Sequence, residues 1–287
     1  MKLASFRWQG KDRFGVVTGD IVNDLSGDAH DLREALTRWG IEGISKRAKA
    51  ATGSIPLGSI EWLPPITNPS KILCVGLNYY EHAKEAKMEV PRHPSIFVRF
   101  PEAQVGHLAP VVRPTASEKF DYEAELAVVI GKPGRHIREE DAGQYVAGYS
   151  CFAENSIRDW QTHSRQATPG KNFEASGAFG PWLVTPDEAG PVEKMEVIGR
   201  LNGTVMQRDS AANMIFSVPA MLSYVSTFIT LSPGDVIVTG TPAGVGFTRT
   251  PPIWLRPGDR FEVEITGVGT LSNPTIDERS TEGNSHA

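Results

Sequence analysis

Residues 122–130 of the chain read YEAELAVVI, the strongest strand pattern in the sequence. Its last five residues, Leu126–Ile130, are all apolar, so this strand is expected to enter a core. Glu123 and Glu125 are two residues apart and therefore share one face of the strand. Two buried carboxylates repel each other, and a hard divalent cation such as Mg²⁺ would resolve the conflict. Locally, a solvent-facing strand edge explains the pair equally well.

Working outward, short strand patterns and turns occur on both sides of this stretch. Further strands are predicted at LASFRW, FGVVTG, DIVNDL, KILCV, PSIFVRF, GPWLVT, VIGRLNG, DVIVTG and DRFEVEITG. Helices are predicted at residues 31–51 and 218–230, with a short polar helix or lid at residues 78–88. Many short strands punctuated by 28 glycines and 21 prolines favour a β-rich mixed α+β fold over a doubly wound sheet.

Composition shifts divide the chain into three predicted parts. Prolines and Asn68 mark a linker near residues 63–71, which separates a small N-terminal α+β domain (residues 1–65) from a catalytic domain (residues 71–277). The polar segment at residues 278–287 is predicted to be a flexible tail.

Charge and composition exclude several classes of function. The net charge of −5 comes with no long run of one sign, so no nucleic acid or membrane surface is expected as a partner. No stretch approaches the roughly 20 apolar residues of a membrane span, and the first residues lack the apolar core of a signal peptide. Cys74 and Cys151 are interpreted as buried, reduced thiols. A cytoplasmic protein is expected.

Three other places carry residues suited to chemistry. His82 and Glu85 lie three apart and would share a helix face, where the carboxylate could orient the imidazole as a general base. Lys171 follows a glycine in TPGKNF and could meet an anionic oxygen. Backbone amides of the loop Thr239–Gly246 (TGTPAGVG) could cradle a carboxylate. Taken singly, a charged surface helix, an exposed lysine and an ordinary loop explain them at least as well.

Six ordered sequence blocks nevertheless resemble one family. The chain is similar to fumarylacetoacetate hydrolase family proteins, and the resemblance runs from about Lys71 to Asn273. The blocks are GLNYYEHAKE (76–85), FDYEAELAVVIG (120–131), AGYSCFAENSIRDWQ (147–161), GKNFEASGAFGPWLVT (170–185), LNGTVMQ (201–207) and LSPGDVIVTGTPAGVG (231–246).

The resemblance implies a family-type β-sandwich or roll core, a homodimer and one divalent cation per chain, Mg²⁺ in the first place and Mn²⁺ or Ca²⁺ otherwise. Its implied metal ligands are Glu123, Glu125 and Glu154, the last at a position where relatives usually carry aspartate. The implied catalytic residues are His82, Glu85, Lys171 and Gln161. The implied substrate-binding residues are Thr241, Gly240, Arg99 and Asn78, with Arg99 in place of the lysine that is frequent in relatives. Arg158 and Asp159 are expected to brace the fold.

For function, the resemblance implies a metal-dependent hydrolase that cleaves a C–C bond in an acylpyruvate-like 2,4-dioxo acid. Hydrolysis is preferred because both His82 and Glu85 are present. The alternative is an isomerase or decarboxylase that acts on 2-hydroxymuconate-type diacids or oxaloacetate, since the same metal-enolate chemistry supports these reactions. A non-catalytic oxo-acid-binding protein ranks lower. In each case the partner is a small oxo acid.

Overall fold

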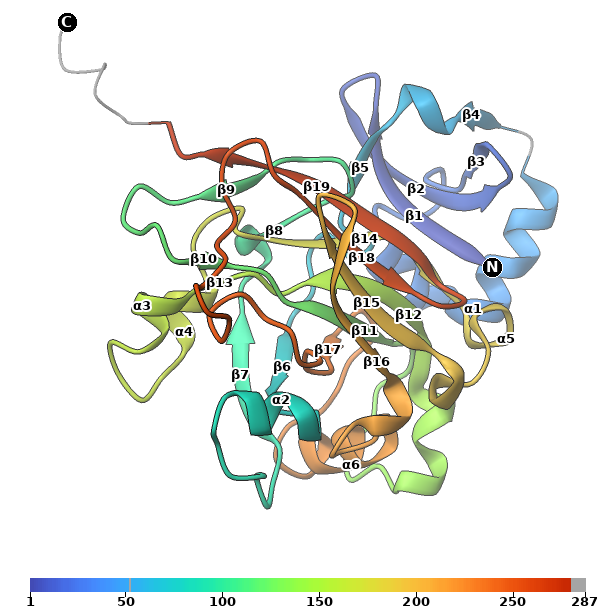
Figure 1. Ribbon diagram of the computed structural model, residues 1–287. Helices are drawn as coiled ribbons and strands as arrows, with labels where there is room; N and C mark the ends of the chain where they lie inside the picture. The colour runs from blue at the N-terminus through green and yellow to red at the C-terminus, as the bar shows by residue number, and fades with distance from the viewer. Residues whose placement is uncertain (52, 280–287) are drawn as a thin grey trace, which may run out of the picture.

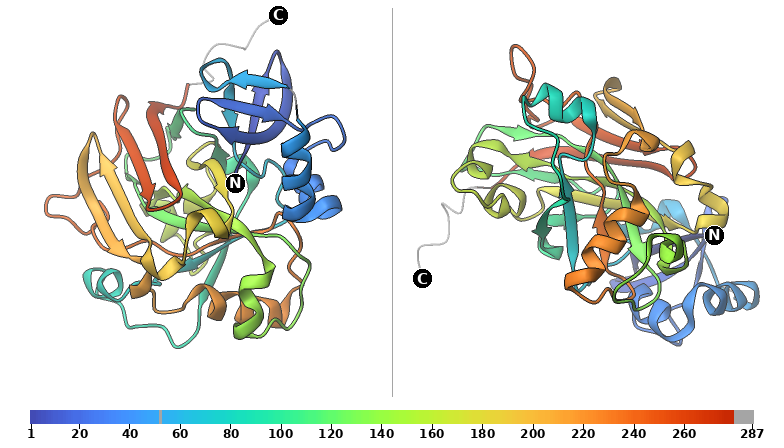
Figure 2. Two further views of the ribbon diagram at one scale, coloured as in Figure 1. Left: turned by 90° about the vertical axis from the view of Figure 1, so that its right-hand side faces the viewer. Right: turned by 90° about the horizontal axis from the view of Figure 1, so that it is seen from below.

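Two packed β-sheets dominate the structure, a computed structural model that describes residues 1–51 and 53–279 (Figure 1). The larger is a 12-stranded sheet in which β4-β3-β2-β1-β14-β12-β11-β17-β6-β7 are neighbours, while β5 pairs with β1 and β8 with β14. The smaller sheet has the order β16-β15-β18-β19-β9 and contacts β11 and β12 of the larger one. In the left view of Figure 2 its yellow-to-red strands form a layer beside the green strands.

The bounds of the elements follow in chain order. The strands of the large sheet are β1 (Lys2–Trp8), β2 (Lys11–Thr18), β3 (Ile21–Asp24), β4 (Ser54–Pro56), β5 (Glu61–Leu63), β6 (Ile72–Gly76), β7 (Ser95–Arg99), β8 (Gln104–Val105), β11 (Ala124–Ile130), β12 (Val146–Ala153), β14 (Gly177–Val184) and β17 (Val236–Val238). The small sheet contains β9 (Val111–Arg113), β15 (Glu196–Leu201), β16 (Thr204–Ser210), β18 (Arg260–Ile265) and β19 (Gly269–Asp277), and a separate pair is β10 (Phe120–Asp121) and β13 (Ser156–Ile157). The helices are α1 (Leu32–Ala50), α2 (Tyr80–Glu85), α3 (Arg158–Gln161), α4 (Thr168–Lys171), α5 (Pro186–Ala189) and α6 (Val218–Phe228), with 3₁₀ turns at η1 (Leu57–Ser59), η2 (Pro101–Ala103), η3 (Glu139–Tyr145), η4 (Val192–Lys194) and η5 (Ala211–Asn213).

Strand β11 carries the apolar run that the sequence analysis began with, and it is buried on both faces. Leu126 and Val128 belong to the core between the two sheets, whereas Ala127 and Val129 belong to a second core that includes α1. Side chains alternate along a strand, so covering both faces requires an unbroken apolar sequence. The predicted entry of this strand into a core is confirmed.

The N-terminal segment joins the large sheet through β1. Lys2 and Leu3 pair with Val184 and Leu183 of β14. Residues 1–65 therefore share hydrogen bonds with the catalytic part of the chain, and the domain boundary at residue 65 stays a prediction. Helix α1, predicted at residues 31–51, begins at Leu32 with Asp31 as its N-cap, although Gly40 interrupts it with a φ of 60°.

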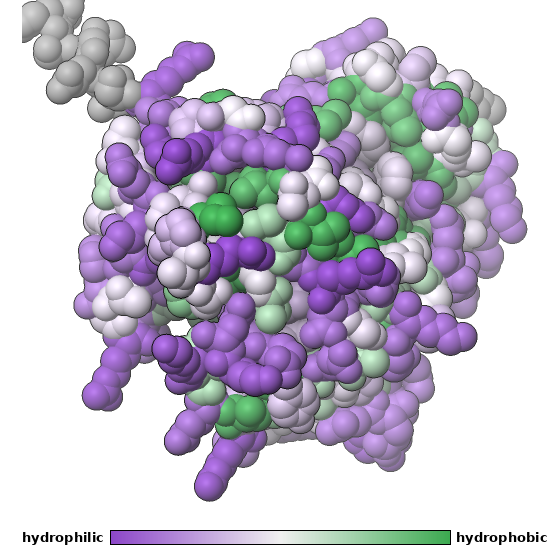
Figure 3. Space-filling view, in the orientation of Figure 1, coloured by the Kyte–Doolittle hydropathy of each residue, from purple (hydrophilic) through white to green (hydrophobic). Residues whose placement is uncertain are grey.

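The surface, the helices and the C-terminal end of the described residues concern the predictions about a membrane and a flexible tail. The face in Figure 3 is mostly hydrophilic, with hydrophobic residues gathered in a few patches. In residues 1–51 and 53–279, none of the helices has the length and apolar character needed to cross a membrane. Most of the predicted tail, from residue 280 on, lies outside the described residues. Glu278, at its start, accepts a 2.8 Å hydrogen bond from the Thr115 backbone amide and is held against the fold.

Candidate active site and metal centre

Three buried glutamates meet where β11 and β12 lie side by side. Glu123 immediately precedes β11, Glu125 is in it, and Glu154 directly follows β12. The Glu154 amide donates to the Glu123 carbonyl at 2.9 Å, which ties the two strand ends together. The three side chains are 1–3% exposed, and one carboxylate oxygen from each lies within 4.8 Å of the others. The structure thus brings the three predicted ligands together.

The electrostatics of this triad fit a cation. Burial, together with the neighbouring charges of Glu154 and Glu123, raises the pKa of Glu125 well above its ordinary value. Burial also raises the pKa of Glu154 to about 7, although Lys171 and Arg99 oppose this. Carboxylate oxygens are the donors that Mg²⁺, Mn²⁺ and Ca²⁺ prefer, and a divalent ion would remove the repulsion. Glu123, Glu125 and Glu154 are therefore the residues that would hold a metal here.

Two basic side chains compensate Glu123. The Lys171 ammonium lies 2.6 Å from Glu123 Oε2 and also pairs with Glu154. The Arg158 guanidinium donates to Glu123 Oε1 at 2.7 Å. Burial alone would raise the pKa of Glu123, but Arg158 and Lys171 hold it well below its ordinary value. Glu123 is consequently ionised.

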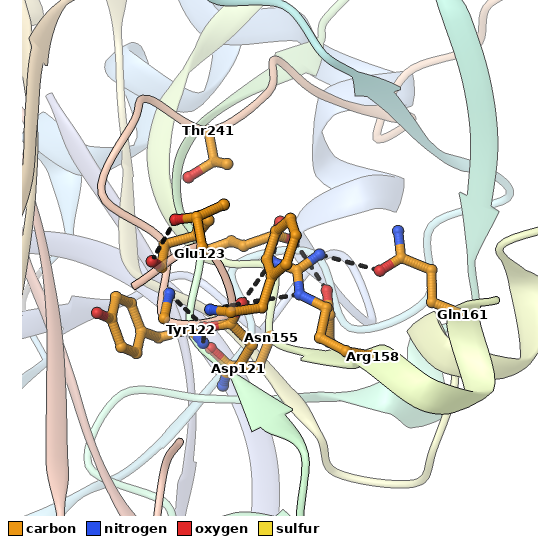
Figure 4. Close-up of polar contacts among 12 residues, drawn as sticks. Asp121, Tyr122, Glu123, Asn155, Arg158, Gln161 and Thr241 are labelled. Carbon is orange, nitrogen blue, oxygen red and sulfur yellow. Dashed lines mark hydrogen bonds and ion pairs between the residues drawn. The ribbon is translucent and has the colours of Figure 1, made fainter. Parts of the chain in front are cut away.

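Arg158 was expected to brace the fold, and in the structure it also pairs with a glutamate of the triad. Its guanidinium also donates to Asp121 Oδ2 at 2.8 Å and to Gln161 Oε1 at 2.9 Å, and it lines the cavity beside the triad. Figure 4 shows it between Glu123 and Gln161. The RDWQ segment alone could not reveal these ion pairs, because the partners of Arg158 are Asp121 and Glu123, more than 30 residues earlier. Asp159 does brace the fold, since it accepts a 2.7 Å bond from Ser117.

His82 and Glu85 form the predicted dyad on the short helix α2. His82 Nδ1 lies 2.8 Å from Glu85 Oε1. Glu85 is fixed in turn by the Gly244 amide at 3.0 Å and by the Thr248 hydroxyl at 3.2 Å. Burial raises the pKa of Glu85, but the bonds from His82 and Gly244 outweigh it and lower the value. An ionised Glu85 favours a proton on Nδ1, which leaves Nε2 as the nitrogen able to accept a proton.

A cavity of about 500 Å³ opens over the triad. Its wall includes Glu123, Glu125, Glu154, His82, Lys171, Gln161 and Thr241 from the predicted set. Phe97, Met88, Leu77 and Phe247 supply apolar surface. A cavity with an apolar lining and a few convergent charged groups is the usual form of a small-molecule site.

Three residues predicted to bind substrate are not among those that line this cavity. Asn78 is fully buried, and its amide donates to the carbonyls of Thr239 at 2.8 Å and Phe216 at 3.0 Å. Gly240 uses its amide to donate to Glu125 Oε2 at 2.6 Å. Arg99 donates to Glu154 Oε1 at 2.7 Å. All three act on the glutamates or their loops and do not face the cavity.

Arg99 stands in a buried polar cluster, defined here as Arg99, Gln104, Asn155 and Ser176. Besides Glu154, its guanidinium donates to the Asn155 carbonyl at 2.9 Å and to the Ser176 hydroxyl at 3.1 Å. Within the described residues, Arg99 Nε, both amide atoms of Gln104 and Asn155 Oδ1 have no hydrogen-bond partner. Unpaired buried polar atoms of this kind are usually satisfied by internal water. The cluster fixes one oxygen of Glu154 from behind.

Comparison with known proteins identifies the family. A family model described as fumarylacetoacetate (FAA) hydrolase, C-terminal, matches residues 71–276. The chain belongs to the fumarylacetoacetate hydrolase family. It is 41% identical over 272 residues to the mitochondrial oxaloacetate tautomerase FAHD2A of Homo sapiens, covering 91% of this chain and 87% of that one. The mitochondrial oxaloacetate tautomerase of Xenopus laevis is 41% identical over 276 residues, with 92% and 86% covered.

Solved structures of family members share the fold. A fumarylacetoacetate hydrolase from Exiguobacterium antarcticum has a TM-score of 0.86 and 34% identity, with 97% of this chain and 100% of that chain covered. The maleylpyruvate hydrolase from Sphingobium sp. SYK-6, solved with manganese(II) and pyruvate, has a TM-score of 0.81, 27% identity and the same coverage. The predicted family and its β-rich α+β fold are confirmed, and this is a family of enzymes.

Proposed function

We propose that the protein is a divalent-metal-dependent tautomerase that interconverts the keto and enol forms of a small 2-oxo dicarboxylic acid of the oxaloacetate class. The observation that carries the proposal is the presence of His82, a proton-exchanging group held by Glu85, on the same cavity wall as the carboxylate triad. The 41% identity to an oxaloacetate tautomerase across nearly the whole chain favours this reaction over hydrolysis. Isomerisation of an oxaloacetate-type acid, the alternative given in the sequence analysis, is therefore preferred here over hydrolysis of an acylpyruvate.

The metal would be held by Glu123, Glu125 and Glu154, with Mg²⁺ as the proposed ion. When bound, such an ion supplies Lewis-acid polarisation of the 2-oxo group and the adjacent carboxylate. The protein's part is to hold the three carboxylates in place, against the burial that raises the pKa of Glu125 and Glu154. Arg99 does so for Glu154, Gly240 for Glu125, and Arg158 and Lys171 for Glu123.

Tautomerisation needs one proton to leave carbon and one to reach oxygen. His82 Nε2 would accept the proton from the carbon next to the 2-oxo group, since Glu85 occupies Nδ1 and stabilises the resulting imidazolium. The C–H electron pair forms the C=C bond, the carbonyl π pair moves onto the oxygen, and this oxygen takes up a proton from water. Lys171 and Gln161 are the hydrogen-bond donors on the cavity wall that would stabilise this oxygen as negative charge develops.

Hydrolysis of an acylpyruvate-like substrate is the second candidate. The His82–Glu85 dyad that removes a proton from carbon could equally remove one from water. The fold shared with the maleylpyruvate hydrolase favours this candidate, at 27% identity. The two reactions differ in their products, because only hydrolysis breaks a C–C bond and releases two acids.

One experiment separates them. Purified protein with Mg²⁺ is mixed with oxaloacetate in deuterated buffer, and proton NMR follows deuterium uptake beside the oxo group above the uncatalysed rate. Parallel incubations with acylpyruvates are assayed for pyruvate. Accelerated exchange that disappears on chelation and returns with Mg²⁺ supports the tautomerase. Pyruvate release from acylpyruvates without accelerated exchange would reverse the order of the two candidates.

The homodimer and the cytoplasmic location remain predictions. Analytical ultracentrifugation of the purified protein tests the first, and a dimer is the expected result.

A further inference from the structure

The basic side chains on the cavity wall differ in whether they have an acidic partner. Three basic side chains line the cavity: Arg158, Lys171 and Arg165. Arg158 pairs with Asp121 and Glu123, and Lys171 pairs with Glu123 and Glu154. In the part of the chain that the structure describes, Arg165 makes neither a hydrogen bond nor an ion pair. Arg165 is therefore a basic side chain of this wall whose charge is not neutralised by any described residue.

Arg165 belongs to a segment anchored to the site at both ends. The segment Thr162–Ala167 connects α3, which ends at Gln161, with α4, which ends at Lys171. The Trp160 ring lies 4.7 Å from the His163 ring and 5.1 Å from the Phe173 ring between centroids, so aromatic contacts fix the start of the segment. The segment faces the same cavity as the glutamate triad, and its own side chains contribute to the wall.

We propose that Arg165 binds the carboxylate of the substrate that is remote from the 2-oxo acid group, and that it thereby selects dicarboxylic over monocarboxylic 2-oxo acids. This inference rests on the proposed function and specifies its substrate class. A guanidinium binds a carboxylate through two parallel hydrogen bonds. Arg165 has no carboxylate partner among the described residues, whereas Arg158 and Lys171 each already pair with Glu123 beside the 2-oxo end of the proposed substrate.

The test compares two four-carbon substrates that differ only in the remote group. Oxaloacetate carries the second carboxylate, and 2-oxobutanoate carries a methyl group in its place. Deuterium exchange beside the oxo group is measured for both with the Mg²⁺-loaded wild type and with the variants Arg165→Gln and Arg165→Lys. Gln166→Ala is the control on the same segment, and Lys46→Gln removes an exposed cation from α1.

For Arg165→Gln we expect a roughly tenfold rise in KM for oxaloacetate, the size expected of one partly solvated charge-assisted contact. The kcat for oxaloacetate and both constants for 2-oxobutanoate should change less than twofold. Arg165→Lys should recover part of the loss, and the two controls should match the wild type. Equal changes for both substrates, or no change for oxaloacetate, would overturn the inference.

A binding experiment keeps this inference separable from the proposed function. Calorimetric titration of the Mg²⁺-loaded protein compares malate with 2-hydroxybutanoate, which lacks the remote carboxylate and needs no turnover. The wild type is expected to prefer malate by roughly tenfold, and Arg165→Gln should lose that preference. If neither 2-oxo acid exchanges but this preference depends on Arg165, the proposed reaction fails and the inference stands. A preference retained in Arg165→Gln refutes the inference whatever the reaction.

Discussion

Glu125 is the least compensated carboxylate of the triad, and this permits a sharp prediction. Among the described residues, its side chain accepts one hydrogen bond, from the Gly240 amide, whereas Glu123 and Glu154 each pair with two basic side chains. Glu125→Gln removes the charge but keeps the shape. We predict that this variant is more stable than the wild type in the absence of metal, although it loses a ligand.

The size of the effect follows from the geometry. Two unit charges 4.8 Å apart repel by about 3 kcal/mol at an effective dielectric constant of about 20. The Lys171 ammonium offsets part of this, so the free energy of unfolding should rise by about 1–3 kcal/mol. For a chain of this size, that raises the melting temperature by roughly 2–8 °C.

The effect should also depend on pH with a definite sign. The pKa of Glu125 is raised by folding, so its contribution to stability is present below the unfolded value near 4.5 and is lost as the pH rises through the folded value. The glutamine variant lacks that loss, and its advantage should therefore grow between pH 5 and pH 8. Glu123, whose pKa is lowered by folding, contributes a constant amount across this range and loses it only in stronger acid.

The assay is thermal unfolding followed by circular dichroism at pH 5 and pH 8, with EDTA and then with Mg²⁺. Glu61→Gln, which neutralises an exposed strand glutamate, is the matched control and should track the wild type. Mg²⁺ at a hundred times its dissociation constant should stabilise the wild type by about 2.7 kcal/mol and so remove most or all of the variant's advantage. A metal-free variant less stable than the wild type at pH 8, or equal stabilisation of both by Mg²⁺, would refute this account of the triad.

Three other variants test the remaining parts of the site. His82→Asn should keep Mg²⁺ affinity in calorimetry yet lower kcat/KM for exchange by roughly 100-fold or more; exchange at the wild-type rate would remove His82 from the mechanism. Lys171→Met removes the cation shared by Glu123 and Glu154 and leaves each with one basic partner, Arg158 and Arg99 respectively. Urea titration of the metal-free protein should give an unfolding free energy lower by roughly 3–5 kcal/mol, with Mg²⁺ restoring part of it; an unchanged value would contradict the pairing. Arg99→Met should weaken Mg²⁺ binding roughly tenfold in calorimetry, with partial recovery in Arg99→Lys, and equal affinity in all three proteins would show that Glu154 needs no support.

The fold could be predicted in outline because its central strand has a strong local signal. The unbroken apolar run of β11 identifies a strand buried on both faces, whatever the neighbouring strands are. Strand β12 was not predicted, because VAGYSCFA mixes small and polar residues and has no clear period. Its identity as a strand comes from pairing with β11 and β14, which supply hydrogen bonds along its two edges, and from contact with β18 and β19 of the smaller sheet. Propensity carries no information about such partners.

The candidate site contains residues that line the cavity, which could be predicted, and residues that hold them in place, which could not. The glutamates, His82 and Lys171 could be identified as a group because blocks of sequence keep their order. The support could not, because each of its bonds joins distant parts of the chain: Arg99 reaches Glu154, 55 residues on, and Asn78 reaches Phe216 and Thr239, 138 and 161 residues on.

Those distant bonds also show what the sequence could not reveal about Asn78 and Arg99, two of the predicted substrate-binding residues. An arginine and an asparagine in chemically rich blocks suit a substrate contact, but a buried amide or guanidinium must first satisfy its own hydrogen bonds. Asn78 does so on the Thr239 carbonyl, next to the Gly240 amide that holds Glu125. Arg99 does so on Glu154 directly. Both side chains are thereby engaged with the glutamate triad or with the loop beside it, whereas the exposed Arg165 makes no such bond among the described residues, which is why we propose it for the remote carboxylate of the substrate.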